Sequence, residues 1–211
     1  MKSHKLMERN LKYKGHRVKI YEDVLESPEG EKLYYDFVEN RNGAGVLLVD
    51  NDGLLIFVKQ YRNALGTFDL EIPAGCAETS DSESVSEPIN DIDVNEPGSD
   101  LKKYNRSDFE KSENPFYKCA LREAEEETGM IPTKLTFVNY IIAAVGLFSE
   151  RTAVYIGENL KRGEMNRDFD EYIEIVRLSL EEALEYIHEG KIIDSKTIIA
   201  IQAYAALLNK K

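Results

Sequence analysis

One stretch of this chain, the acidic run at residues 122–129, constrains the fold more than any other. At 100° per residue, a helix places Glu123, Glu126 and Glu127 on one face and apolar residues such as Leu121 on the opposite face. The run therefore predicts a helix that packs by one face and presents three carboxylates on the other.

Three carboxylates held together repel one another, and a fold that clusters them usually supplies a compensating cation. Oxygen ligands suit hard ions, so this face predicts a site for Mg²⁺, with Mn²⁺ as an alternative. A solvated Glu run explains the same residues without a metal, because Glu is a good helix former. The helix by itself leaves both interpretations open.

The run resembles the second half of the Nudix box, whose family pattern is G-x5-E-x7-R-E-U-x-E-E-x-G-U, with U a bulky aliphatic residue. Every position of that half is filled, although one U position holds the small residue alanine. In chain order, the matching residues are Arg122, Glu123, Ala124, Glu126, Glu127, Gly129 and Met130.

The segment 71–75, Glu-Ile-Pro-Ala-Gly, resembles the strand end and loop that open the box. From Gly75 to Arg122 is 47 residues where the family pattern gives 14, so 33 residues are extra. The position eight residues before Arg122, which belongs to the first box Glu, holds Asn114, and Glu113 lies one residue away. The resemblance implies a box split by an insertion and leaves the role of Glu113 open.

The insertion, residues 79–113, contains seven Ser, two Pro and ten acidic against four basic residues. Its apolar residues are scattered singly, which predicts an exposed loop with a short helix near 100–111 rather than a second core. A lid over the site or a contact with a partner is the alternative.

The composition fits one globular domain with a small accessory part. A net charge of −12 argues against a general nucleic-acid binder, which needs a basic surface. The two cysteines and three histidines form no metal-ligand pattern, so no zinc site is expected. No apolar run approaches the about 18 residues of a spanning helix and no signal segment is visible, so we expect a cytoplasmic protein without membrane partners.

Residues 17–25 and 32–39 alternate polar and apolar side chains around a turn at 27–30 and predict an antiparallel hairpin. A second hairpin is predicted for 44–49 and 54–59. A chain that begins in this way resembles the ADP-ribose pyrophosphatase branch of the Nudix family.

In that branch an N-terminal β subdomain, here residues 1–42, mediates homodimerisation and contributes to the nucleotide pocket. The catalytic domain, here residues 43–211, follows it. The resemblance therefore implies a homodimer, with Tyr35 as the first and His16 as the second candidate to stack on the base. Either residue is equally explained by packing.

Further substrate contacts follow from the same resemblance. Arg62 lies where the branch places an arginine that contacts phosphate or ribose, and a guanidinium can grip phosphate oxygens bidentately. Gly146 and Glu150 lie in a segment that matches a substrate-facing loop. A surface arginine, and a surface pair of Glu150 with Arg151, are the alternative explanations.

The resemblance also implies roles in catalysis. Glu123 and Glu127 are metal ligands, Glu126 is a further ligand or a base, and the Ala74 carbonyl is a backbone ligand. Arg122 orients the glutamates by salt bridges.

An acidic segment near residue 171 matches a loop that supplies a metal ligand or general base. Glu171 is the best positional match. A solvated acidic turn is the alternative.

The implied fold is the Nudix fold, an α/β/α sandwich with a mixed sheet, preceded by a small antiparallel β subdomain. The box helix is expected from Pro115 to Thr128, and two later helices start at a capping box at residues 179–182 and near Ser195. The implied reaction is Mg²⁺-dependent hydrolysis of a nucleoside diphosphate derivative, first of all ADP-ribose to AMP and ribose 5-phosphate. Another nucleotide sugar or a dinucleotide, or a non-catalytic ligand sensor of the same fold, are the alternatives.

Overall fold

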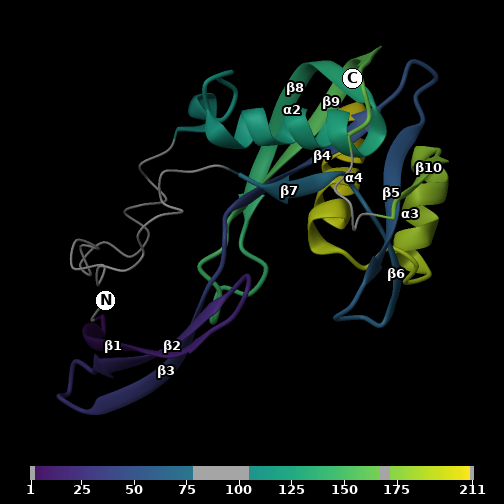
Figure 1. The fold of residues 1–211 in the computed structure, drawn as a ribbon. Coiled ribbons are helices and arrows are strands. Elements are labelled where there is room, and N and C mark those ends of the chain that lie inside the picture. The colour runs from purple at the N-terminus through teal and green to yellow at the C-terminus, as the bar shows by residue number, and fades with distance from the viewer. Residues whose placement is uncertain (1–2, 78–104, 167–171, 210–211) are drawn as a thin grey trace.

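The structure is a computed structural model that describes residues 3–77, 105–166 and 172–209. In this part of the chain the strands form two sheets, and three α-helices pack on the larger one (Figure 1). The elements are, in chain order, β1 (Lys5–Lys14), β2 (Lys19–Glu26), β3 (Lys32–Glu39), β4 (Gly43–Val49), β5 (Leu55–Arg62), β6 (Thr67–Glu71), β7 (Ala74–Cys76), η2 (Arg106–Asp108), α2 (Pro115–Thr128), β8 (Met130–Ile141), β9 (Thr152–Arg162), β10 (Glu174–Leu178), α3 (Leu180–His188) and α4 (Ser195–Leu208).

The first three strands form a separate antiparallel sheet in the order β1-β2-β3. β2 and β3 pair from Lys19 with Glu39 to Glu26 with Lys32, so the hairpin predicted around residues 27–30 is confirmed. The sequence did not indicate β1, because its register shifts twice against β2, and such bulges break the alternation of apolar and polar side chains.

The second sheet is mixed, with strand order β10-β5-β4-β9-β8, β6 beside β5 and β7 beside β4. β4 pairs with β9 in parallel, whereas the other pairings described for this sheet are antiparallel. Along β4, Ala44, Val46 and Leu48 belong to the core under α2, while Leu47 and Val49 belong to the core under α3 and α4. Helices thus cover both faces of the sheet, which confirms the α/β/α sandwich.

Local signals set the ends of the helices. α2 begins after Asn114, whose side chain accepts a hydrogen bond from the Phe116 amide at 2.9 Å, and ends at Gly129, which has a left-handed φ of 68°. Ser179 and Glu182 form the predicted capping box of α3. Asn114 therefore serves as a cap at the position that the family pattern gives to a Glu. No helix in the described ranges is long and apolar enough to span a bilayer.

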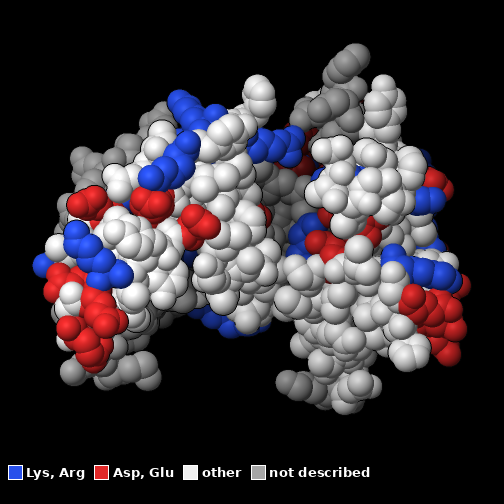
Figure 2. Space-filling view, turned by 90° about the horizontal axis from the view of Figure 1, so that it is seen from below, with Lys and Arg blue, Asp and Glu red and all other residues white. Residues whose placement is uncertain are grey.

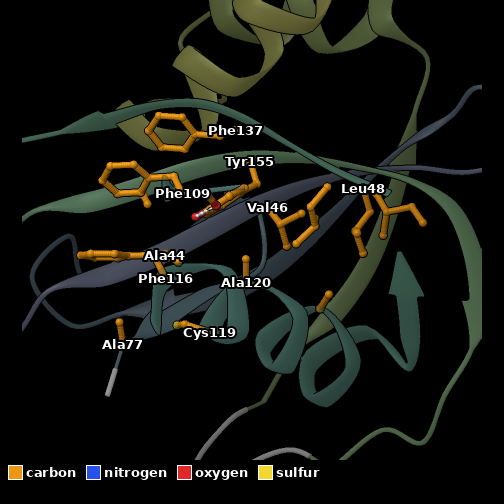
Figure 3. Close-up of a cluster of buried hydrophobic side chains, with 14 residues drawn as sticks. Ala44, Val46, Leu48, Ala77, Phe109, Phe116, Cys119, Ala120, Phe137 and Tyr155 are labelled. Carbon is orange, nitrogen blue, oxygen red and sulfur yellow. Dashed lines mark hydrogen bonds between the residues drawn. The ribbon is translucent and has the colours of Figure 1, made fainter. Parts of the chain in front are cut away.

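The last part of the insertion contains a short helix, η2, as expected, but Phe109 after it is buried rather than exposed. Phe109, which follows η2, is buried and stacks on Phe137 with ring centroids 4.3 Å apart (Figure 3). The carbonyl of Phe109 accepts a hydrogen bond from the Tyr155 hydroxyl at 3.0 Å, and Arg106 donates to carbonyls of β8. A single aromatic residue in a polar segment has no periodicity that could reveal this packing. Residues 79–104 lie outside the described part of the chain.

The N-terminal sheet lies away from α2 and is tied to the body of the molecule through β3 (Figure 1). The Val38 amide donates to the Leu147 carbonyl at 2.8 Å, and the Ser149 amide donates to the Val38 carbonyl at 3.1 Å. The side-chain amide of Asn40 donates to the Glu150 carboxylate at 2.5 Å. Seen from below, a hollow separates the part of the molecule that contains the N-terminal sheet from the rest (Figure 2).

Candidate active site

The loop between β6 and β7 brings the two halves of the split box together at α2. Gly75 lies so close to Glu123 that a Cβ at this residue would be 1.8 Å from the carboxylate oxygen Oε1. The Ala74 amide donates to Oε2 of Glu127 over 3.3 Å, and the Cys119 thiol donates to the Gly75 carbonyl over 3.3 Å. The opening loop and the acidic helix form one site, although the insertion separates them in sequence.

Arg122 holds two of the three carboxylates. Its Nη2 lies 2.5 Å from Oε1 of Glu123, and its Nη1 lies 2.5 Å from Oε2 of Glu126. Nη2 also donates to the Cys76 carbonyl at 3.1 Å, which ties α2 to the end of β7. Burial opposes the charged guanidinium, but the negative charges of Glu123 and Glu126 outweigh it and raise the pKa of Arg122. Arg122 thus fixes both carboxylates by salt bridges.

The three carboxylates differ in exposure, contrary to the single open face that the helical pattern predicts. Glu123 and Glu127 are buried, because β7, which contains Ala74 and Gly75, packs over them. The side chain of Glu126 is 32% exposed. The acidic side of α2 is therefore also a packed surface, with one carboxylate open to solvent.

The two cysteines lie beside these carboxylates. Burial, and next the negative charge of Glu123, raise the pKa of the Cys119 thiol to about 12. Cys119 is therefore a neutral thiol at neutral pH, neither a nucleophile nor a thiolate ligand. Cys76 is exposed and contributes its backbone carbonyl to Arg122. The donors that remain for a metal are oxygen atoms.

These donors fit a hard divalent cation. Arg122 pairs with both Glu123 and Glu126, which leaves one negative charge among these three groups, and Glu127 adds a further carboxylate on the same helix. In the described ranges, no three His, Cys, Asp or Glu side chains converge as a ready-made metal cluster. Arg122 and the Ala74 amide hold the carboxylates in separate hydrogen bonds, so they must turn toward a cation to share it.

A second charged cluster surrounds Glu71 at the end of β6. Arg62 donates from Nε and Nη2 to the two carboxylate oxygens of Glu71, with 2.8 Å between Nη2 and Oε2. Lys196 donates to the same Oε2 at 2.5 Å and lies 3.0 Å from Asp194. Burial favours the protonated form of Glu71, but Arg62 and Lys196 outweigh it and lower the pKa. The hydrogen bond to Glu71, with the charges of Glu71 and Glu127, raises the pKa of Arg62 despite its burial.

The remaining predicted residues lie in other parts of the molecule. Tyr35 is an exposed residue of β3, and His16 lies in the exposed turn between β1 and β2, both away from α2 (Figure 1). Gly146 lies in an exposed turn, and Glu150 accepts hydrogen bonds from Asn40 at 2.5 Å and from a threonine hydroxyl at 3.3 Å. Glu171 lies outside the described residues.

Sequence reasoning missed Lys196 and Asp194 altogether. Their signal is weak, because a polar pair at the start of a mostly apolar helix is also what an ordinary helix cap looks like. The partner of Lys196, Glu71, is 125 residues away along the chain. No local pattern connects residues at that separation.

Comparison with known proteins places this site in a family. No protein-family model matches the chain. An ADP-ribose pyrophosphatase of Bacillus subtilis (strain 168) is 31% identical and a methanol dehydrogenase activator of Bacillus methanolicus is 30% identical, each over 192 residues, 90% of this chain and 86% of the relative. A crystal structure of an ADP compounds hydrolase, 18% identical, matches with a TM-score of 0.75 over 100% of this chain and 96% of its own, which shows the fold. The chain belongs to the ADP-ribose pyrophosphatase-like family of Nudix proteins.

Proposed function

We propose that this protein hydrolyses the pyrophosphate of ADP-ribose to AMP and ribose 5-phosphate, with Mg²⁺ as its cofactor and Mn²⁺ as a substitute. The observation that carries the proposal is the contact of Gly75 with Glu123, which restores the box geometry across the insertion. The name of the Bacillus subtilis relative supports ADP-ribose among the ADP compounds that fit such a site.

Glu123, Glu127 and the Ala74 carbonyl would hold the cation, and Glu126 is a further ligand or the acceptor of a proton. When bound, Mg²⁺ supplies positive charge to the phosphate oxygens and makes water more acidic. Water adds to one phosphorus, its proton passes to a carboxylate, the P–O–P bond breaks and two monophosphates leave. Arg122 holds Glu123 and Glu126 by salt bridges in the absence of a cation, and the carboxylates would turn toward the cation when it binds.

The substrate would be held by residues that the family resemblance implies. A guanidinium has five N–H donors, so the two bonds from Arg62 to Glu71 leave donor capacity for a phosphate or ribose oxygen. We assign Glu171 as the general base or a further metal ligand. The other proposed substrate contacts are Tyr35, His16, Gly146 and Glu150.

Homodimerisation through the N-terminal sheet and a cytoplasmic location stay predictions. In a single chain, Tyr35 and His16 are far from α2, so their assignment to the nucleotide pocket depends on this assembly (Figure 1). Sedimentation velocity of the purified protein tests it. A monomer at the concentrations used for turnover would remove both residues from the proposed site.

The relative named as a methanol dehydrogenase activator supports a second candidate, in which hydrolysis serves to activate a dehydrogenase. It matches the same length of chain with nearly the same identity as the pyrophosphatase. Other nucleotide sugars, dinucleotides and a purely sensory role are further alternatives, since the box acts on the diphosphate and leaves the rest of the ligand to the pocket.

One screen separates these candidates. ADP-ribose, ADP-glucose, GDP-mannose, NADH and diadenosine polyphosphates are each incubated with Mg²⁺ or Mn²⁺, and the products are identified by chromatography. We expect AMP from ADP-ribose with the highest kcat/KM. Binding of ADP-ribose without turnover would support the sensory role. A higher kcat/KM for another compound would identify that compound, instead of ADP-ribose, as the substrate.

A further inference from the structure

In the cluster around Glu71, the most buried group is the carboxylate, and its two cations differ in exposure. The side chain of Lys196 is 15% exposed, that of Glu71 is 2% exposed and that of Arg62 is 37% exposed. One carboxylate therefore joins a more buried cation to a more exposed one. The backbone that follows Glu71 leads to the carboxylates of α2, because the Ala74 amide donates a hydrogen bond to Glu127 at 3.3 Å, and the charge of Glu127 contributes to the raised pKa of Arg62.

The oxygen Oε2 of Glu71 is shared by both cations. Nη2 of Arg62 approaches it to 2.8 Å, and Nζ of Lys196 approaches it to 2.5 Å. Asp194, 3.0 Å from Lys196, supplies a second carboxylate, so the four side chains are neutral as a group. Loss of the Lys196 ammonium would leave two carboxylates against one guanidinium. Arg62 would then have to compensate for both of them.

The first turn of α4 also anchors the main chain next to Glu71. The Ile72 amide donates to Oγ1 of Thr197 at 2.9 Å, and this hydroxyl donates to Asp194 at 2.6 Å. Ile72 leads directly toward β7, which packs over Glu123. The same helical turn therefore fixes both the side chain and the backbone at the end of β6.

We propose that Lys196 is a positioning residue for the hydrolysis: it neutralises the buried carboxylate of Glu71, so that Glu71 holds the Arg62 guanidinium at the edge of the site. The inference rests on the proposed function, in which Arg62 contacts the phosphate or ribose of the substrate. Lys196 itself touches no substrate. Its effect reaches the reaction through Glu71 and Arg62.

A merely structural role for Lys196 predicts a different result. If Lys196 only ties α4 to β6, its loss lowers stability and leaves the KM of the folded enzyme unchanged. If it acts through Arg62, its loss raises KM, and this effect disappears once Arg62 is gone. The coupling between Lys196 and Arg62 therefore separates the two roles.

The test is a double-mutant cycle with Lys196→Met, Arg62→Ala and the pair of changes, assayed with ADP-ribose and Mg²⁺. We expect Lys196→Met to raise KM about tenfold with kcat within about threefold, the pattern of lost substrate binding. Lys196→Arg should recover most of the loss. In the Arg62→Ala background, Lys196→Met should change KM by less than about twofold. Lys134→Met, which removes an exposed lysine paired with Glu158, is the control and should match the wild type.

An unchanged KM in folded Lys196→Met, or KM effects that multiply in the double variant, would overturn the proposal. If Lys196→Met does not fold, Lys196→Gln takes its place in the cycle with the same expectations. Wild-type turnover is measured first and reports on the proposed function alone. If the wild type is inactive, the position of Arg62 can be tested without turnover, by following hydrogen exchange of its Nε–H with NMR. We expect faster exchange in Lys196→Met than in the wild type. An unchanged exchange rate would contradict the inference.

Discussion

Two charged clusters lie on either side of the β6–β7 loop, and their charge balance differs. Around Glu71, the carboxylates of Glu71 and Asp194 pair with two cations, Arg62 and Lys196, and the buried Asp69 lies close by. Around Arg122, one guanidinium pairs with the two carboxylates of Glu123 and Glu126, so one negative charge is left over among these three groups. The side chains of Glu71 and Lys196 are 2% and 15% exposed, whereas those of Glu126 and Arg122 are 32% and 42% exposed.

The difference indicates different tasks for the two clusters. A balanced, buried cluster is complete without a ligand and fixes the backbone and side chains around it, because removing any member leaves an uncompensated charge. An unbalanced cluster with one open carboxylate is suited to an incoming divalent cation. The short loop from Glu71 to Gly75 joins the two, so the rigid cluster can set the geometry of the reactive one.

The largest effect is expected for Glu71→Gln, which removes the buried carboxylate shared by Arg62 and Lys196 and leaves Asp194 as the remaining partner of Lys196. Breaking a buried ion cluster in this way costs about 3–5 kcal/mol of stability at neutral pH. Urea unfolding, fitted with a common slope, measures the difference. A change below about 1 kcal/mol, the size seen for exposed ion pairs, would remove the distinction between the two clusters.

The pH dependence of this difference has a definite sign. The folded pKa of Glu71 lies below its ordinary value of 4.5, because Arg62 and Lys196 outweigh burial. The carboxylate therefore contributes its full stabilisation above that ordinary value and loses it as the pH falls through the folded pKa. The difference in the free energy of unfolding between wild type and Glu71→Gln should therefore become smaller as the pH falls below about 4.5. A gap of constant size from neutral pH to about pH 3 would contradict the assignment.

The next effect concerns the unbalanced cluster. Glu127→Gln keeps the size of the side chain and an oxygen for the Ala74 amide but removes a ligand charge, so we expect kcat to fall by about 100-fold or more. The fold, followed by circular dichroism, should persist. Mg²⁺ at about 100 times its Kd would stabilise the wild type by about 2.7 kcal/mol, and the variant should lose most of this gain. Normal turnover in the folded variant would disprove the metal assignment.

A smaller effect is expected where β7 meets α2. In Gly75→Ala the new Cβ would lie 1.8 Å from Oε1 of Glu123, so the carboxylate must move. We expect kcat to fall by roughly tenfold to 100-fold, because small displacements at a reacting centre cost rate. Cys76→Ala, which trims an exposed neighbouring side chain, is the control. Equal rates for the two variants would show that the close contact is not required.

The smallest effect is expected for the stability of Glu126→Gln in a metal-free buffer. Glu126 and its partner Arg122 are 32% and 42% exposed, and ion pairs at such positions contribute about 0–1 kcal/mol. Urea unfolding beside Glu71→Gln gives the direct comparison. A loss as large as that of Glu71→Gln would show that the two clusters stabilise the fold equally.

The sequence predicted the elements well where the signal is local. Asn114 and Gly129 bound the box helix, Ser179 and Glu182 cap α3, and the alternating strands pair as expected. The sequence did not predict β1, because bulges interrupt the alternation of its side chains. It also did not predict the burial of Phe109, which depends on residues of β8 and β9.

The candidate site also has a part that was predicted from the sequence and a part that depends on the tertiary structure. In the sequence, helical spacing placed the three carboxylates on one face beside an arginine, and the resemblance to the Nudix box implied the opening loop and the role of the guanidinium. Only the tertiary structure decided that Ala74 meets Glu127, 53 residues away, and that Glu71 meets Lys196, 125 residues away. These contacts arise where the end of a strand packs against two helices on opposite faces of the sheet. No periodicity along the chain records such an arrangement, because it depends on how whole elements pack.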